Sequence, residues 1–187
     1  MQHTMRASRC VRWFGRYHVS MASPSVPTHS MLDPVTAEFI CGDVSIAVAS
    51  RDAANVPAIV RALGTRVSRD RASIGVFVAR SQAGEVLRNI RDNAAVAVVW
   101  SRPTTNRTVQ FKGRDARVEA AVSGDADLVA AHSARFVDAI VALGYPDYLP
   151  RTLMASSVDD LAVIAFTPTD GYAQTPGPNA GARLPAP

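Results

Sequence analysis

The order of strand-like and helix-like segments constrains the fold of this 187-residue chain more than any other feature of its sequence. Several strand-like segments follow one another with only short turns between them, and helical segments interrupt the series in few places. A parallel sheet needs a long crossover between successive strands, usually a helix, so this order favours antiparallel pairing. The sequence therefore predicts an α+β fold in which a mainly antiparallel sheet closes into a barrel with flanking helices.

The expected strands are short and apolar. They cover residues 45–50, 57–65, 72–79, 94–100, 107–119 and 161–167. In the fifth of these, Val109 and Phe111 alternate with Gln110 and Lys112, which is typical of a strand with one buried and one accessible face. No G-x-G-x-x-G motif follows any strand, so a doubly wound dinucleotide-binding sheet is disfavoured.

Three helices are expected, over residues 34–41, from residue 81 onward, and over residues 124–143. Asp33 followed by Pro34 is typical of an N-cap and a first helical position. Ser81 is the expected cap of the second helix, with Glu85 in its first turn. Gly144 is expected to end the third helix in the left-handed conformation.

The net charge of +4 arises in the N-terminal segment alone. Four of the 20 basic residues and none of the 16 acidic residues lie in residues 1–32, so the remainder is neutral overall. A neutral domain offers no basic excess to a nucleic acid. No apolar run of about 18 residues occurs, so no membrane-spanning helix is expected. The two cysteines are too few for a disulfide scaffold or a four-ligand zinc site, which favours the cytoplasm.

The composition divides the chain into three parts. Residues 1–30 are rich in arginine and serine and contain no acid, as in a mitochondrial transit peptide. The favoured alternative is a mis-assigned start codon, with translation from Met21 or Met31. Residues 31–175 form the expected domain. Residues 176–187 are a tail rich in glycine and proline, for which no regular structure is expected.

Three sequence blocks resemble the motifs of the pyridoxamine 5'-phosphate oxidase-like superfamily in order and spacing. They are R-A-L-G-T-R (61–66), G-V-F-V-A-R-S-Q-A-G-E-V-L (75–87) and N-R-T-V-Q-F-K-G (106–113). The similarity spans about residues 38–175, and the ending F-T-P-T-D-G-Y-A-Q-T-P-G-P resembles a subgroup of uncharacterised members. The resemblance implies a split β-barrel that forms a homodimer, with FMN at the interface and a small-molecule substrate.

The resemblance also implies a set of cofactor-binding residues. These are Arg61, Val78, Ala79, Ser81, Gln82, Arg107, Thr108 and Gln110. Ser81 corresponds to the serine at a phosphate-facing helix start, where backbone amides favour an anion. Arg61 is suited to a bidentate contact with the same phosphate. Thr108 and Gln110 share one face of their strand with Lys112 and are suited to the polar edge of an isoalloxazine ring.

Departures from the oxidase motifs weaken the case for the oxidase reaction itself. The S-R-K of the oxidases is Ser81, Gln82 and Ala83 here, so two phosphate-binding cations are missing. Arg66 stands where the oxidases have a lysine linked to substrate. The Tyr…Arg-Pro…Ser constellation that binds the substrate phosphate has no counterpart in residues 128–143. Pyridoxamine 5'-phosphate oxidation is therefore not expected, and FMN is expected to bind weakly.

Two kinds of function remain open. The first is an FMN-dependent oxidoreductase with an unknown substrate, in which no catalytic residue can be named. The second is a non-catalytic carrier or sensor that binds a flavin, a deazaflavin or haem, and a weaker third is a dimeric remnant with an empty cleft. No metal site is expected, because the sequence has no H-x-x-x-H, C-x-x-C or clustered carboxylates. His132, beside the apolar stripe of the third helix, is expected in the core or an interface.

Overall fold

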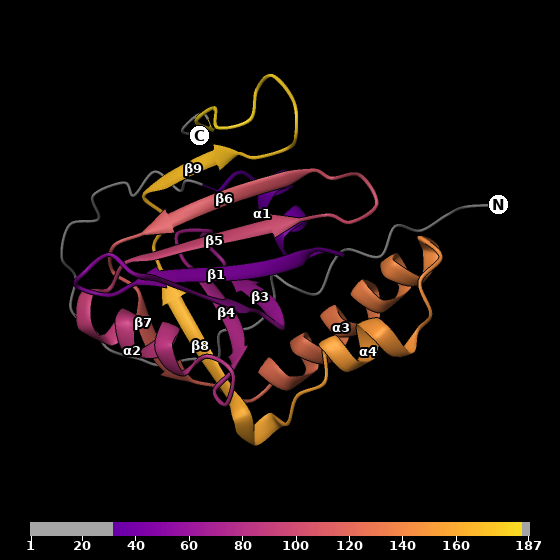
Figure 1. Ribbon diagram of the computed structural model, residues 1–187, viewed down its shortest axis with the longest axis horizontal. Coiled ribbons are helices and arrows are strands. Elements are labelled where there is room, and N and C mark those ends of the chain that lie inside the picture. The colour runs from indigo at the N-terminus through magenta and orange to yellow at the C-terminus, as the bar shows by residue number, and fades with distance from the viewer. Residues whose placement is uncertain (1–31, 185–187) are drawn as a thin grey trace.

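The computed structural model describes residues 32–184 and contains two antiparallel sheets with helices around them (Figure 1). Sheet A has five strands in the order β2-β1-β5-β6-β9, and sheet B has four in the order β3-β4-β8-β7. The strands are β1 (Ser45–Arg51), β2 (Pro57–Arg61), β3 (Gly64–Val67), β4 (Ile74–Ala79), β5 (Val96–Ser101), β6 (Thr108–Gly113), β7 (Arg117–Ala120), β8 (Leu161–Phe166) and β9 (Asp170–Ala173). The predicted α+β fold with mainly antiparallel pairing is confirmed.

Four helices accompany the sheets in the part of the chain that the structure describes. They are α1 (Pro34–Ile40), α2 (Gly84–Asn93), α3 (Asp125–Ala142) and α4 (Tyr148–Leu153). The start of α1 and the end of α3 agree with the predicted capping residues. Asp33 caps α1, since its carboxylate accepts the amides of Val35 and Thr36 at 2.8 and 2.9 Å. Gly144 follows α3 with a φ of 91°, as predicted. None of the helices within residues 32–184 is long and apolar enough to cross a membrane.

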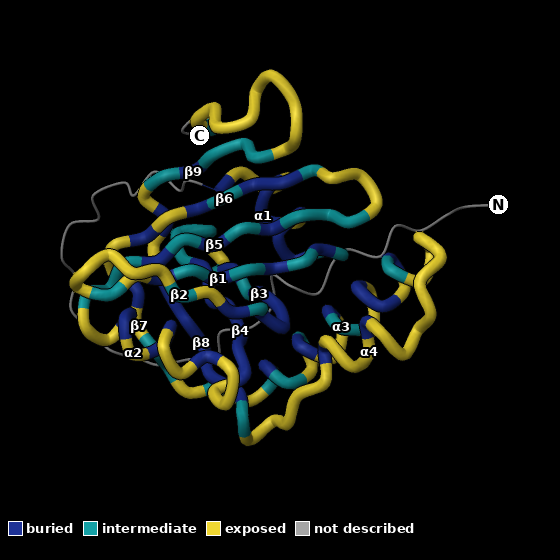
Figure 2. The backbone as a smooth tube through the Cα atoms, in the orientation of Figure 1, coloured by how far each residue is buried: buried dark blue, intermediate teal, exposed yellow. Residues whose placement is uncertain are grey.

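The apolar side chains form two packed regions (Figure 2). The larger lies inside the barrel, where Trp100 and Phe111 meet edge to face with ring centroids 6.0 Å apart. The smaller lies between the outer face of sheet B and helices α3 and α4, and includes Phe77, Phe136 and Val163. Every residue of β4 and β8 is buried because both faces of these strands are covered.

Two segments that the sequence predicts as single strands are each divided between the sheets. The prediction of one strand over 57–65 is wrong, because the chain leaves sheet A after Arg61 and enters sheet B at Gly64. The Ala62 amide bonds the Ile46 carbonyl at 2.9 Å, and the Leu63 amide bonds the Phe77 carbonyl at 2.8 Å. The change of sheet therefore takes place between these two residues.

The strand predicted over 107–119 is divided in the same way. It forms β6 in sheet A and β7 in sheet B, with a turn between Gly113 and Arg117. A Cβ atom on Gly113 would lie 2.6 Å from Cδ2 of Phe166, so only glycine permits this close approach at the corner. Periodicity continues through such a corner, and this is why the sequence pattern did not reveal it.

Candidate functional site

The outer face of sheet A carries a row of half-buried side chains that crosses all five strands. Direct pairing in the register joins them in the order Arg61, Ala47, Val99, Gln110 and Tyr172. Residues paired in this way point to the same side of a sheet, and their neighbours along each strand point into the barrel. The row therefore places two predicted site residues, Arg61 and Gln110, on one face.

Small side chains occupy the middle of this face. Ala47, Ala49, Ala97 and Val99 are half-buried and lie next to one another on β1 and β5. We call these four residues the small-residue face. Alanine and valine leave a shallow, apolar surface without protruding groups, and no helix crosses it in Figure 1. Such a surface is suited to a flat partner.

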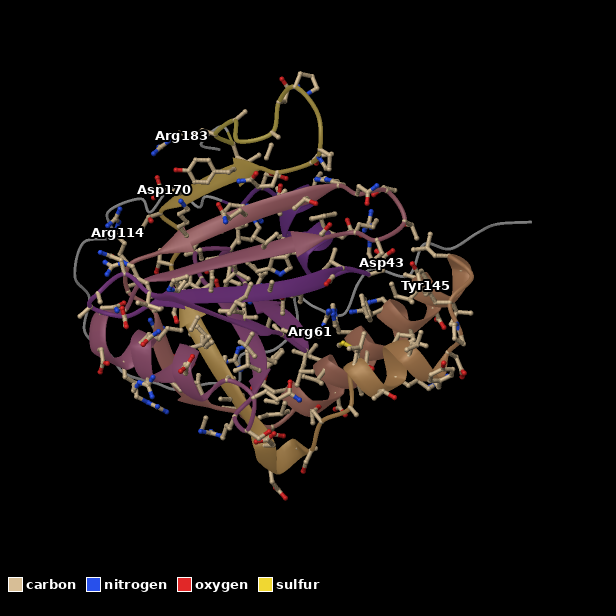
Figure 3. All side chains as sticks on the ribbon, viewed as in Figure 1. Asp43, Arg61, Arg114, Tyr145, Asp170 and Arg183 are labelled. Atoms are coloured by element: carbon tan, nitrogen blue, oxygen red, sulfur yellow. The ribbon has the colours of Figure 1, made fainter. Side chains whose placement is uncertain are left out.

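Arg61 lies at the edge of the face that is nearest α3 (Figure 3). Its Nη1 donates to Ser45 Oγ at 3.1 Å, and its guanidinium carbon lies 6.0 Å from the centroid of the Phe136 ring. No acidic side chain among residues 32–184 forms an ion pair with it. The positive charge of Arg61 is therefore available to an anionic ligand.

The remaining predicted residues of β6 differ in what they offer. The Thr108 hydroxyl lies 2.8 Å from Ser101 Oγ and donates to the Asn106 carbonyl at 3.0 Å, so it is already engaged. Within the described residues, the Gln110 amide group has no hydrogen-bond partner and is half-exposed. Arg107 lies with its guanidinium 4.3 Å from the centroid of the Phe39 ring, beside α1.

Val78 and Ala79 lie in the packed interior, and their side chains are almost completely buried. Val78 belongs to the barrel core, and Ala79 lies under α3 and α4. Both are paired with β8 through the register Val78 to Ala162 and Ala79 to Leu161. The structure therefore brings their side chains together with neither Arg61 nor Gln110.

Ser81 lies before α2 and does not cap it. The N-cap is Ala83, and no side chain bonds the first amides of the helix, so the predicted cap is wrong. Instead the Ser81 amide and hydroxyl both donate to the Asp160 carboxylate, at 2.9 and 2.5 Å. The hydrogen bond from the Ser81 hydroxyl is the main reason why the pKa of Asp160 is lowered. Gln82 is exposed beside it.

A cleft of about 510 Å³ lies between α1, α3 and the turn that joins β5 to β6. Asp43 and Arg102 on its wall form an ion pair at 2.8 Å, and Arg135 donates to the Cys41 carbonyl at 2.9 Å. The sequence analysis did not single out Asp43, Arg102 or Arg135. They are far apart in the chain and belong to no shared motif, so no local signal marks them.

His132 lies in the core, which is one of the two places that the sequence predicts for it. It is 2 % exposed, its ring stacks on Phe136, and its Nδ1 has no hydrogen-bond partner within the described residues. Burial, and then the nearby charge of Arg135, lowers the pKa of His132 to about 4. Residues 32–184 contain no group of three or more histidine, cysteine or acidic residues able to hold a metal ion.

Comparison with known proteins gives a likeness of fold. No family model and no curated protein matches the chain. HupZ of Group A Streptococcus is 18 % identical over 81 % of this chain and 100 % of its own, with a TM-score of 0.49. An F420 reductase is 16 % identical over 71 % and 92 %, with a TM-score of 0.47.

A pyridoxamine 5'-phosphate oxidase-related, FMN-binding protein from Nostoc punctiforme is 16 % identical over 73 % of this chain and 77 % of its own, with a TM-score of 0.41. The superfamily that the sequence motifs resemble is thus found among the solved structures to which this chain is similar. At these identities and TM-scores, the likeness says nothing about cofactor or activity.

Proposed function

We propose that this chain binds a flavin-type cofactor against the outer face of sheet A and transfers electrons between it and a small-molecule substrate. FMN is the member of this class that the sequence motifs indicate. The observation that carries the proposal is the row in which Arg61 and Gln110 stand on opposite sides of Ala47 and Val99. A planar ring system needs a flat apolar surface with a few polar groups at its margin.

The chain offers a suitable surface for the ring of FMN but not for its phosphate at the predicted position. The small-residue face matches the ring, because its side chains are short and Gln110 has a free amide able to both donate and accept hydrogen bonds. The predicted phosphate position at Ser81 does not match, because the Asp160 carboxylate already takes both of its donors. Arg61 and Arg107 form no ion pair within residues 32–184, and Arg61, on the row itself, is available to an oxygen atom of the ligand.

A second copy of the chain is the proposed cover of the same face. Ile59 on the outermost strand β2 is 72 % exposed and lies in register with Ala49, at the margin of the small-residue face. Exposed apolar residues beside a shallow apolar surface favour association, which would exclude water from a bound ring. A homodimer with the cofactor between its chains is therefore part of the proposal.

In the proposed mechanism the residues of the chain bind the flavin and orient it. A bound flavin supplies the hydride chemistry, so the protein needs no acid or base of its own. In such a complex Gln110 would hold the polar edge of the ring, and Arg61 would donate hydrogen bonds to an oxygen atom of the ligand. The Ser81–Asp160 contact favours one alternative, a carrier or sensor of a flavin or deazaflavin nucleotide, because a phosphate-bearing ligand without its phosphate contacts is released more readily.

The test is a visible absorbance spectrum of residues 31–187 after addition of FMN or of riboflavin and dialysis, followed by titration of variants with the flavin that is retained. Arg61→Ala is expected to weaken flavin binding about tenfold, the cost of losing one charged hydrogen bond. Arg51→Ala is the matched control, because Arg51 is an exposed arginine on the same sheet, in register with Pro57 away from the row. A protein that releases all added flavin contradicts the proposal, and turnover of a nicotinamide donor distinguishes an enzyme from a carrier.

A further inference from the structure

The loop of residues 80–83, between β4 and α2, already binds a negatively charged side chain of the same protein, the carboxylate of Asp160. Ser81 donates its amide to Asp160 Oδ1 at 2.9 Å and its hydroxyl to Asp160 Oδ2 at 2.5 Å. One carboxylate therefore engages two donors of the same residue.

The loop has the general properties of an anion site. It leads from the end of a strand into the N-terminus of α2, a ten-residue helix whose first amides carry partial positive charge. The hydrogen bonds from Ser81 lower the pKa of Asp160 most, and the charge of Arg80 also lowers it. An anion at Ser81 is therefore favoured, and Asp160 supplies it.

The position of the Asp160 carboxylate is fixed by the sheet. Asp160 ends a short 3-10 helix (Val158–Asp160) and directly precedes β8, which pairs with β4 along its whole length. Its backbone carbonyl also accepts the Arg80 amide at 2.7 Å. The two strands thus bring Asp160 and Ser81 together, and the carboxylate does not depend on a long loop for its place.

A second negative charge lies near the same loop. Glu85 is in the first turn of α2, and its exposed side chain forms an ion pair with Arg88 at 3.8 Å. A phosphate monoester arriving at Ser81 would face the Asp160 carboxylate at hydrogen-bonding range, with Glu85 four residues further along the chain. Like charges at such separations are unfavourable even in water.

We infer that Asp160 excludes phosphate from this loop and makes the chain prefer a flavin without a terminal phosphate over FMN. The inference rests on the proposed function, since it specifies which flavin the site takes. Asp160 is then a specificity-determining residue, because its carboxylate takes both hydrogen-bond donors of Ser81 and its charge repels a phosphate. The oxidase motifs have cations at the two positions after the serine, where this chain has Gln82 and Ala83. Arg80, before the serine, donates its Nε to the Leu161 carbonyl.

The first experiment measures the dissociation constants of riboflavin and FMN by quenching of flavin fluorescence, at one fixed ionic strength. The unaltered protein is expected to bind FMN no more tightly than riboflavin. Asp160→Ala is expected to strengthen FMN binding about tenfold and to leave riboflavin unchanged. Asp159→Ala is the matched control, because it removes an equal charge from the same 3-10 helix and Asp159 has no contact with Ser81.

A second measurement needs no flavin. The amide resonance of Ser81 is followed in the labelled protein while inorganic phosphate is added. We expect a saturable shift in Asp160→Ala and none in the unaltered protein or in Asp159→Ala. A shift in the unaltered protein, or none in Asp160→Ala, overturns the inference, as does an unaltered protein that binds FMN tenfold more tightly than riboflavin. If the phosphate result is as expected and no flavin binds, the role of Asp160 in excluding phosphate stands and the proposed function fails.

Discussion

The outer faces of the two sheets differ in what lies on them. Helices α3 and α4 cover sheet B, and Phe136 packs there with Phe77 and Val163 in a closed apolar cluster. Among residues 32–184, no helix covers the middle of sheet A, where the side chains are small and half-exposed (Figures 1 and 2). The covered face contributes stability, and the open face is available for binding.

Among the variants that test this difference between the two sheets, Phe136→Ala is expected to lower the free energy of unfolding most. Phe136 is almost fully buried between α3 and sheet B, so its loss leaves a cavity and should cost about 3–5 kcal/mol of unfolding free energy. Urea denaturation measures the loss. Val141→Ala on the same helix is the control, because Val141 is 42 % exposed and its truncation should change stability by about 0.5 kcal/mol or less. Equal losses in the two variants would mean that α3 does not close sheet B.

Asp125→Ala tests how α3 is held against sheet B. Both carboxylate oxygens of Asp125 bond Arg66 Nη1 of β3, at 2.7 and 2.6 Å, and Oδ2 also accepts the Val122 amide. Removing one partner of a buried pair leaves a desolvated charge, so a loss of about 3 kcal/mol is expected. Asp127→Ala, at an exposed position in the same first turn, should cost about 0.5 kcal/mol through the helix dipole alone. Similar losses would contradict a special role for the Arg66 contact.

The stability of the covered face should also depend on pH through His132. Its pKa is lowered to about 4 by burial and by Arg135, from an ordinary value of 6.5 in the unfolded chain. As the pH falls below 6.5, His132 therefore binds a proton in the unfolded chain but not in the folded protein. This favours unfolding, and the free energy of unfolding is expected to fall by about 2 kcal/mol between pH 7 and pH 5. Urea denaturation at the two values measures this loss, and His132→Gln should reduce the difference. An unchanged difference in that variant would assign the pH dependence to other groups.

Elements set by residues close in the chain could be predicted from the sequence better than the corners between the two sheets. The apolar spacing of α3 and the cap at Asp33 depend on residues close in the chain, and both elements lie where the sequence predicts them. The corners at Ala62 and Gly113, where the chain changes sheet, depend on packing against residues of other strands, such as Phe166. The alternation of apolar and polar residues along the chain therefore does not reveal them. Gln110 was found because alternation within one strand marks its face.

Contacts between distant residues limited the sequence analysis of the candidate site. Asp160 is 79 residues from Ser81, and Arg102 is 59 residues from Asp43. Each partner taken alone is an ordinary turn residue, and only the sheet pairing brings the two together. The motif therefore indicated a serine suited to phosphate, and the structure shows that the serine already has an anionic partner.

The smallest expected effect compares the two sides of one strand. Val98 and Val99 are neighbours on β5, with Val98 fully buried inside the barrel and Val99 on the small-residue face. Val98→Ala should cost about 2 kcal/mol through lost burial and a cavity, whereas Val99→Ala should cost about 0.5 kcal/mol or less in dilute protein.

The same pair of variants also tests what covers sheet A, because a second copy would bury Val99 only at concentrations where the chains associate. Urea denaturation of Val99→Ala is therefore repeated at increasing protein concentration. A loss that grows with concentration identifies another copy of the chain as the cover of this face. A loss as large as that of Val98→Ala at every concentration would mean that the face is already closed within one chain, and the distinction between the two sheets would fail.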